Sequence, residues 1–254
     1  MIEIRNLTKI YDSRNVLDDI SVDIKNGEIF TIMGPSGIGK STFIKSIVRL
    51  ITPESGKIII DGDDILKTNK EFEIQKIRKK FGYLFQEGAL FDSLNVWENV
   101  SFGLKYLTDI AQSDYIRIAK EKLQLVGLKD IEYKKVNELS GGMKKRVALA
   151  RAIAHNPKYI LYDEPTTGLD PISSEIIINL IKEMSEKLNI TSIVVTHDVK
   201  LALTISTRIG MLFNGRFLDI NTPEGIKESK IKEVKEFIET SFIEDVTVQS
   251  DKRK

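Results

Sequence analysis

The stretch that decides the fold of this chain reads Gly34-Pro35-Ser36-Gly37-Ile38-Gly39-Lys40-Ser41. It matches the phosphate-binding pattern G-x-x-x-x-G-K-[S/T] at every position. The apolar run 29–33 before it predicts a buried strand, and residues 42–50 after it predict a helix. A strand, a glycine-rich loop and a helix in this order predict an α/β protein that binds the phosphates of a nucleotide.

The glycine-rich loop offers several ligands to such a nucleotide. Its glycines let the backbone N–H groups point inward, and the positive end of the following helix adds to their attraction for phosphate. We expect Lys40 to reach the β- and γ-phosphates, and the hydroxyl of Ser41 is a candidate Mg²⁺ ligand. We extend the predicted phosphate site by one residue, to Thr42. A chance glycine turn is the alternative, and the flanking strand and helix argue against it.

Composition limits the class of protein. The chain has 254 residues, 41% of them apolar, which is enough for one or two domains with a sizeable core. The net charge is +1, so we expect no nucleic-acid partner and no direct attraction to an anionic membrane. Cysteine is absent, which excludes disulfides and thiolate metal sites. No apolar run approaches the ~18 residues of a membrane span and no signal peptide is evident, so we predict a cytosolic protein.

Strand and helix patterns alternate along the chain. Residues 2–33 predict an antiparallel β layer that leads into the strand before the phosphate loop, with Asn26-Gly27 as a hairpin turn. From residue 87 to about 157 helical spacing replaces strand patterns, which predicts a helical subdomain inserted in the sheet. We therefore expect one domain over residues 1–222 and a helical C-terminal extension over 223–254, whose last ten or so residues form a loose tail.

Polar side chains follow three further predicted strands at the point where each ends. They are Gln86, the pair Asp163-Glu164, and His197. Because open α/β sheets bind ligands at the carboxyl ends of their strands, we expect these groups near the phosphate loop. Asp163 is then a candidate Mg²⁺ ligand, and Glu164 is a candidate general base for the attacking water. Gln86 and His197 could sense the γ-phosphate and orient that water. A helix cap for the acids and a structural histidine are the alternatives.

A second glycine motif, Ser140-Gly141-Gly142, opens a helix predicted from about residue 142 to 155. Its N–H groups, its hydroxyl and the positive helix end could bind another anion. An ordinary serine N-cap is the alternative. Because one nucleotide does not need two phosphate sites separated by a helical insertion, we expect this motif to face the nucleotide held by a second copy of the chain.

Together these residues resemble the nucleotide-binding subunit of an ABC transporter over roughly residues 1–222. Three matching positions belong to the nucleotide site of that family: Tyr11 at the adenine-stacking position, the Walker A loop 34–41 and the Walker B strand 160–164. The other matching positions are Gln86 in the Q-loop, the signature motif 139–143, the D-loop Gly168-Leu169-Asp170 and the switch histidine His197. The resemblance implies a RecA-like P-loop NTPase with a mixed sheet, and ATP and Mg²⁺ as cofactors. It also implies Gln86 as a further Mg²⁺ ligand, Asp170 at the nucleotide, and a head-to-tail dimer that moves a membrane permease.

One departure from the family's usual signature motif indicates which subgroup of ABC ATPases the chain resembles. The family's signature motif usually ends in Gln, whereas this chain has Met143, and the stretch Gly88-Ala89-Leu90-Phe91 follows the Q-loop. Both features resemble the ATPases of lipid transporters that work with an MCE-domain protein, the Mla type. We therefore expect a phospholipid transporter ATPase on the inner face of the plasma (inner) membrane, attached through its permease.

Three alternatives remain open for the function. They are an importer ATPase for a polar solute such as an amino acid, a soluble mechanical ABC ATPase of the cell-division or DNA-repair kind, and a nucleotide-gated module that does not hydrolyse ATP. The apolar residues Phe91, Leu94 and Trp97 are candidates for the permease groove, and a place in the core is their alternative.

Overall fold

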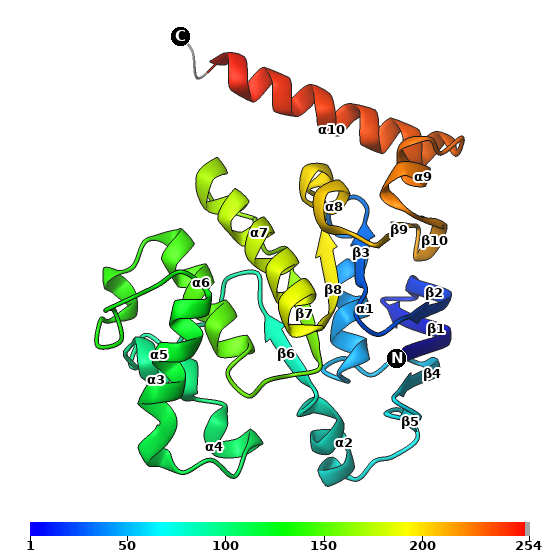
Figure 1. The fold of residues 1–254 in the computed structure, drawn as a ribbon. Helices are drawn as coiled ribbons and strands as arrows, with labels where there is room; N and C mark the ends of the chain where they lie inside the picture. The colour runs from blue at the N-terminus through cyan, green and yellow to red at the C-terminus, as the bar shows by residue number, and fades with distance from the viewer. Residues whose placement is uncertain (252–254) are drawn as a thin grey trace. The chain divides into compact units, whose positions relative to one another are not determined.

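The structure is a computed structural model that describes the backbone of residues 1–251 and the side chains of residues 1–241. Contacts within the chain divide it into two units (Figure 1). The first unit consists of Met1–Ile74 and Ile193–Lys254, and the second is Gln75–Ser192. Helix α2 (Glu71–Arg78) runs across the boundary between them. Each unit contains some of the candidate site residues named in the sequence analysis.

The predicted antiparallel layer is present in the first unit as a four-stranded sheet with the order β2-β1-β4-β5. Its strands are β1 (Ile2–Tyr11), β2 (Arg14–Ile24), β4 (Ser55–Ile60) and β5 (Asp63–Asp64). The central strand β1 pairs antiparallel with both β2 and β4. A tight turn with positive φ at Asp12 and Ser13 joins β1 to β2. Alternate residues such as Ile2 and Ile4 are fully buried, as expected for a sheet with one covered face.

The predicted hairpin at Asn26-Gly27 is wrong. A turn is present there, with Gly27 at φ 76°, but β2 and β3 (Ile29–Met33) belong to different sheets. Every residue of β3 is buried, and β3 pairs in parallel with β9 (Arg208–Phe213). A strand buried on both faces belongs inside a parallel sheet, whereas β2 has one exposed face. The turn therefore carries the chain from one sheet to the other.

The second sheet of the first unit surrounds β3. Its strands lie in the order β10-β9-β3-β8, where β8 is Thr191–Thr196 and β10 is Arg216–Asn221. Strands β9 and β10 pair antiparallel as a hairpin, with Asn214 and Gly215 of its turn both at positive φ. Helices α1 (Lys40–Ile47) and α8 (Val199–Ile205) directly follow β3 and β8 in the chain, as in other wound α/β folds.

The C-terminal extension contains α9 (Pro223–Lys227) and α10 (Lys232–Asp251), drawn in orange and red in Figure 1. Val234 and Ile238 of α10 are buried in a cluster with Val199 and Ala202 of α8 and with Met211 of β9. This contact anchors the first turns of α10 to the first unit. The backbone is helical to Asp251, so the predicted loose tail is wrong for the residues described, and residues 252–254 lie outside the described part.

The second unit pairs two parallel strands, β6 (Phe81–Leu84) and β7 (Tyr159–Asp163). The segment between them is helical, as predicted. It contains α3 (Val96–Ser101), α4 (Leu104–Leu107), α5 (Tyr115–Leu125), α6 (Gly141–Ala152) and the short 3-10 turns Gln112–Asp114 and Val136–Glu138. Helix α7 (Pro171–Leu188) follows β7 and has Asp170 as its N-cap, because the Asp170 carboxylate accepts from Ser173 N at 2.9 Å. Within residues 1–251, no helix combines the length and the apolar character that a bilayer span requires.

Candidate active site

The glycine-rich loop runs from the end of β3 to α1 in a conformation that needs glycine at two places. Gly34 has φ 151°, and a Cβ there would collide with the carbonyl of Leu212. Gly39 has φ 109°, and its Cβ would lie 2.8 Å from the Val16 carbonyl oxygen. Positive φ and close backbone neighbours both exclude a side chain. The loop is therefore a fixed backbone cradle, as expected for a phosphate site.

Lys40 is held inside this cradle. Its side chain is buried, and Nζ donates to the carbonyls of Gly34 at 2.8 Å and Pro35 at 2.9 Å. Helix α1 begins after Gly39, which has no side chain to cap the first turn. Ser41 and Thr42 are the next residues of that turn. The ammonium and the uncapped helix start together place positive electrostatic potential at the loop.

Two further predicted residues lie in the first unit. Tyr11 is the last residue of β1, its ring is 43% exposed, and the Nζ of Lys9 lies 4.9 Å from the ring centre. An exposed ring can stack on a base, whereas the alternative of an edge aromatic requires no ligand. His197 is exposed directly after β8, which is the neighbour of β3 in the sheet. A hollow of about 140 Å³ near the loop is lined by Arg14, Asn15, Val16, Gly37, Ile38, Asn214 and Gly215.

The second unit holds the acidic pair. Asp163 ends β7 with 3% exposure, and Glu164 follows with 8% exposure and φ 46°. A left-handed backbone at a buried glutamate is strained, and such strain is typical of functional sites. The hydroxyl of Tyr83 on β6 donates to Asp163 Oδ2 at 3.1 Å. Burial and the Asp163 charge raise the pKa of Tyr83, so this hydroxyl stays a donor that orients the carboxylate.

Gln86 lies two residues beyond β6 with an exposed side chain, and its carbonyl accepts a hydrogen bond from Lys145 Nζ. Burial lowers the pKa of Lys145, while the charges of Glu87, Asp163 and Glu164 act in the opposite direction. Tyr83 and Lys145 were missed by the sequence analysis. Tyr83 reads as one aromatic of a buried strand, and Lys145 reads as one cation of a solvated basic run, so neither pattern signals a contact with the acids.

The motif Ser140-Gly141-Gly142 starts α6. Ser140 is the N-cap, and its Oγ accepts from Met143 N at 3.3 Å, so the ordinary capping role is present. Gly142 is buried, and a Cβ there would lie 2.6 Å from Ser173 Oγ. The same Oγ donates to Asp170 Oδ2 at 2.6 Å. This side-chain bond is the main cause that holds the pKa of Asp170 below its usual value, and the bond from the Ser173 backbone N–H is the next. The motif and Asp170 are thereby brought together through Ser173.

The donor set fits a hard cation rather than a transition metal. The described residues contain no group of three or more His, Cys, Asp and Glu side chains able to hold a metal ion. Mg²⁺ prefers few protein ligands, all oxygen, and completes its shell with phosphate and water. A hydroxyl such as that of Ser41 and a carboxylate such as that of Asp163 have this chemistry.

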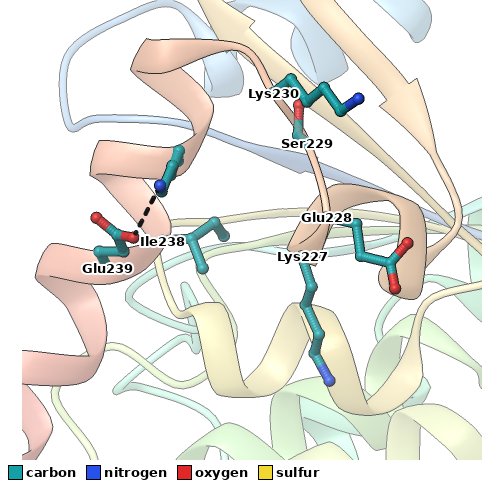
Figure 2. A pocket seen from close by; sticks show the side chains of 7 residues that line it. Lys227, Glu228, Ser229, Lys230, Ile238 and Glu239 are labelled. Atoms are coloured by element: carbon teal, nitrogen blue, oxygen red, sulfur yellow. Dashed lines mark ion pairs between the residues drawn. The ribbon is translucent and has the colours of Figure 1, made fainter.

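A second hollow, of about 470 Å³, lies between the end of α9 and the start of α10 (Figure 2). Lys227, Lys230 and Lys235 line it together with Glu228 and Glu239. Lys235 and Glu239 form an ion pair at 3.7 Å, marked by the dashed line in Figure 2. Charges of both signs cancel much of the local potential, so this hollow does not select a phosphate in the way that the glycine-rich loop does.

Comparison with known proteins identifies the family. Residues 17–167, more than half of the chain, match the family described as ABC transporter. The chain belongs to this family. The resemblance inferred from the sequence motifs is therefore confirmed, and so is the predicted fold class of a P-loop α/β protein with an antiparallel N-terminal sheet. The chain is accordingly an ATP-binding subunit of the ABC transporter type and an ATPase.

Two relatives of this ABC subunit carry different transport names. The "probable ribonucleotide transport ATP-binding protein mkl" of Mycobacterium leprae is 42% identical over 93% of this chain and 68% of its own length. The "intermembrane phospholipid transport system ATP-binding protein MlaF" of Haemophilus influenzae is 41% identical over 94% of this chain and 90% of its own length. The family and the ATPase activity are thus fixed, while the transported substance differs between the two names.

A solved ABC cassette has the same fold. It is described as the dimeric structure of a post-hydrolysis state of an ATP-binding cassette bound to ADP and Pi. Its sequence is 35% identical to this chain, and the TM-score is 0.81 over 88% of this chain and 99% of that one. That protein was therefore captured as a dimer with the products of ATP hydrolysis, which agrees with the assignment of an ATPase here.

Proposed function

We propose that this chain hydrolyses ATP to drive a membrane transporter that moves phospholipid, together with a permease and an MCE-type partner. The observation that carries the proposal is the 41% identity to the phospholipid transport subunit MlaF, which extends over 90% of that protein. Met143 and the stretch 88–91 after the Q-loop support the same subgroup. The chain then lies on the inner face of the inner membrane through its permease.

The catalytic roles follow from the chemistry of each residue. ATP binds to the Walker A loop through Lys40 and the backbone N–H groups of residues 34–42, and Tyr11 stacks on the adenine. Mg²⁺ would be held by Ser41, Asp163 and Gln86, and it would supply charge stabilisation to the phosphates. Glu164 accepts the proton of the attacking water, and His197 orients the γ-phosphate.

A second copy completes each site in this proposal. The N–H groups at the start of α6 and the hydroxyl of Ser140 bind the γ-phosphate held by the other copy, with Asp170 next to them. Met143 has no hydrogen-bonding group comparable to Gln, so the contact depends on Ser140 and the two glycines. Closure of the head-to-tail dimer around two ATPs then moves the permease.

The permease is proposed to dock on an exposed aromatic patch of the second unit, made by Phe91, Phe102 and Tyr106. Phe91 and Phe102 are each 42% exposed with ring centres 4.5 Å apart, and Tyr106 is 61% exposed. Leu94 and Trp97 are partly exposed, which argues against the alternative that this segment forms the core. Apolar patches with polar surroundings are typical of protein interfaces.

Glu164→Gln tests the hydrolytic part of the proposal. It keeps the size and hydrogen bonding of the side chain but removes the base, so turnover should fall by about 10²–10⁴-fold while ATP binding remains. ATP hydrolysis and ATP affinity are measured side by side, with the exposed Glu121→Gln as the matched control. Retention of most turnover by Glu164→Gln would remove Glu164 as the base.

Purification from membranes tests the lipid part. The Glu164→Gln variant, locked with ATP, is isolated with its bound partners, and the proteins and lipids are identified by mass spectrometry. We expect a permease, an MCE-domain protein and co-purified phospholipid. The second candidate, transport of a polar solute, is favoured by the ribonucleotide name of the mycobacterial relative. A permease accompanied by a solute-binding protein, with turnover raised by that solute, would establish it instead.

A further inference from the structure

Lys145 of α6 is a buried cation of the second unit. Its side chain is 5% exposed, although it stands within the basic run Lys144-Lys145-Arg146. Burying an ammonium costs free energy unless nearby groups compensate for the lost water. A lysine in a run of surface cations would ordinarily avoid this cost by extending into solvent. The burial of Lys145 therefore indicates specific partners.

Those partners come from two loops of the second unit. The Nζ of Lys145 donates to the carbonyl oxygen of Gln86, in the loop after β6. The charges of Asp163 and Glu164, at the end of β7, and of Glu87 favour the ammonium form, against the effect of burial. Lys145 is thus bonded to the backbone of Gln86, and the negative charges at the end of β7 favour its charged form.

The helix that carries Lys145 is attached to the same loop at a second point. Arg151 lies six residues further along α6, and its guanidinium donates to Gly88 O at 2.6 Å and to Ala89 O at 2.7 Å. The carbonyls of three residues after β6 are thereby held by one rigid helix. Ser140 begins that helix, so the Q-loop backbone is fixed relative to the signature motif.

We propose that Lys145 is a positioning residue for ATP hydrolysis, which fixes the backbone of Gln86 and places a positive charge beside Asp163 and Glu164. The proposal rests on the roles proposed above for Gln86, Asp163 and Glu164. Two neighbouring buried carboxylates repel each other, and a fixed cation offsets this repulsion. Lys145 has no part in the Walker A loop, so its loss should lower turnover and leave the affinity for ATP unchanged.

Lys145→Met tests this inference, because it keeps the length of the side chain but removes the charge and the donors. We expect kcat to fall by about 10- to 100-fold, as for a misplaced catalytic group, with KM for ATP within about twofold of its original value. Lys145→Arg keeps a charge and donors and should recover most of the turnover. The matched control is Lys120→Met, an exposed lysine on α5 of the same unit. Unchanged kcat in Lys145→Met, or failure of Lys145→Arg to recover turnover, would overturn the inference.

An effect of Lys145→Met on folding is distinguished from an effect on positioning by measuring the number of sites that bind nucleotide. A fluorescent ATP analogue gives the amount of binding-competent protein, and kcat is expressed per bound nucleotide. A normal kcat per site in Lys145→Met would show a purely structural lysine and overturn the inference. Glu164→Gln is measured in parallel. If it keeps its turnover, the proposed site roles fail; if it loses turnover while Lys145→Met does not, only the role of Lys145 fails.

Discussion

Two helices of this chain begin at glycine motifs, and their first turns are built differently. Helix α1 follows Gly39, which has a left-handed backbone and offers no side-chain cap. Helix α6 follows Ser140, which caps its own first turn through Met143 N. Gly34 and Gly39 cannot carry a Cβ without a backbone collision, whereas the Cβ of an alanine at Gly142 would meet the side chain of Ser173, at 2.6 Å from Oγ and 3.0 Å from Cβ.

The difference separates a complete phosphate site from a partial one. The start of α1 has a curled loop, a buried lysine and a helix end whose N-cap, Gly39, makes no side-chain bond, and these are the parts that a phosphate site within one chain uses. The start of α6 satisfies part of its own hydrogen bonding and contributes a hydroxyl and a helix dipole. We therefore propose phosphate binding within one chain for the first motif, and for the second a role only when another copy supplies the nucleotide.

Ser140→Arg is expected to have the largest effect on this comparison. The bulky cation at the start of α6 should lower turnover by about 100-fold or more, as for the loss of a transition-state donor, and leave ATP binding to the dilute monomer unchanged. Thr222→Arg is the matched control, because Thr222 caps helix α9 of the first unit in the same way. Equal loss of monomer binding in Ser140→Arg would remove the distinction between the two motifs.

Gly39→Ala and Gly142→Ala compare the two backbones directly. Gly39→Ala forces a Cβ to within 2.8 Å of Val16 at φ 109°, so we expect a loss of about 1–3 kcal/mol of stability and weaker ATP binding. Gly142→Ala should lower stability less than Gly39→Ala, because the nearest atom, Ser173 Oγ, can rotate away from the new Cβ and alanine favours the helix, although Ser173 Cβ stays at 3.0 Å. Chemical denaturation and ATP titration of both variants measure this contrast, and equal losses would contradict it.

The smallest expected effect concerns pH and the far end of α6. His155 follows that helix, its Nε2 lies 3.1 Å from Phe81 O, and burial lowers its pKa below the ordinary 6.5. The unfolded chain therefore binds the proton more readily, so the free energy of unfolding should decrease as the pH falls through 6.5. Denaturation curves between pH 7.5 and pH 5.5 measure this slope. His155→Gln should flatten this slope; an unchanged slope in His155→Gln would exclude this cause.

Most of the fold could be predicted because local patterns were strong. The largely apolar, fully buried strands β3, β7 and β8 and the capped start of α7 at Asp170 agree with their sequence signals. The turn at Asn26-Gly27 was misread, because a tight-turn dipeptide does not reveal which sheet the next strand joins. That choice depends on β9, which lies about 180 residues further along the chain.

The motifs of the candidate site could be predicted from the sequence, but the residues that hold those motifs in place could not. Walker A, Walker B and the signature motif are contiguous in sequence, so each can be recognised alone. Tyr83 and Lys145 act on residues 80 and 59 positions away. A basic run is usually solvated, and nothing local in the sequence indicates that its middle member is buried.

The left-handed backbone of Glu164 affects which residue type selection would favour at position 164. At φ 46° the backbone accepts glycine or asparagine more readily than glutamate. Folding and hydrolysis therefore make opposite demands on one residue. A library of the chain sorted for heat resistance alone would collect glycine or asparagine at position 164, and a library sorted for turnover would keep the glutamate. Position 164 is thus a trade-off between stability and turnover, and selection for stability alone would tend to remove the glutamate.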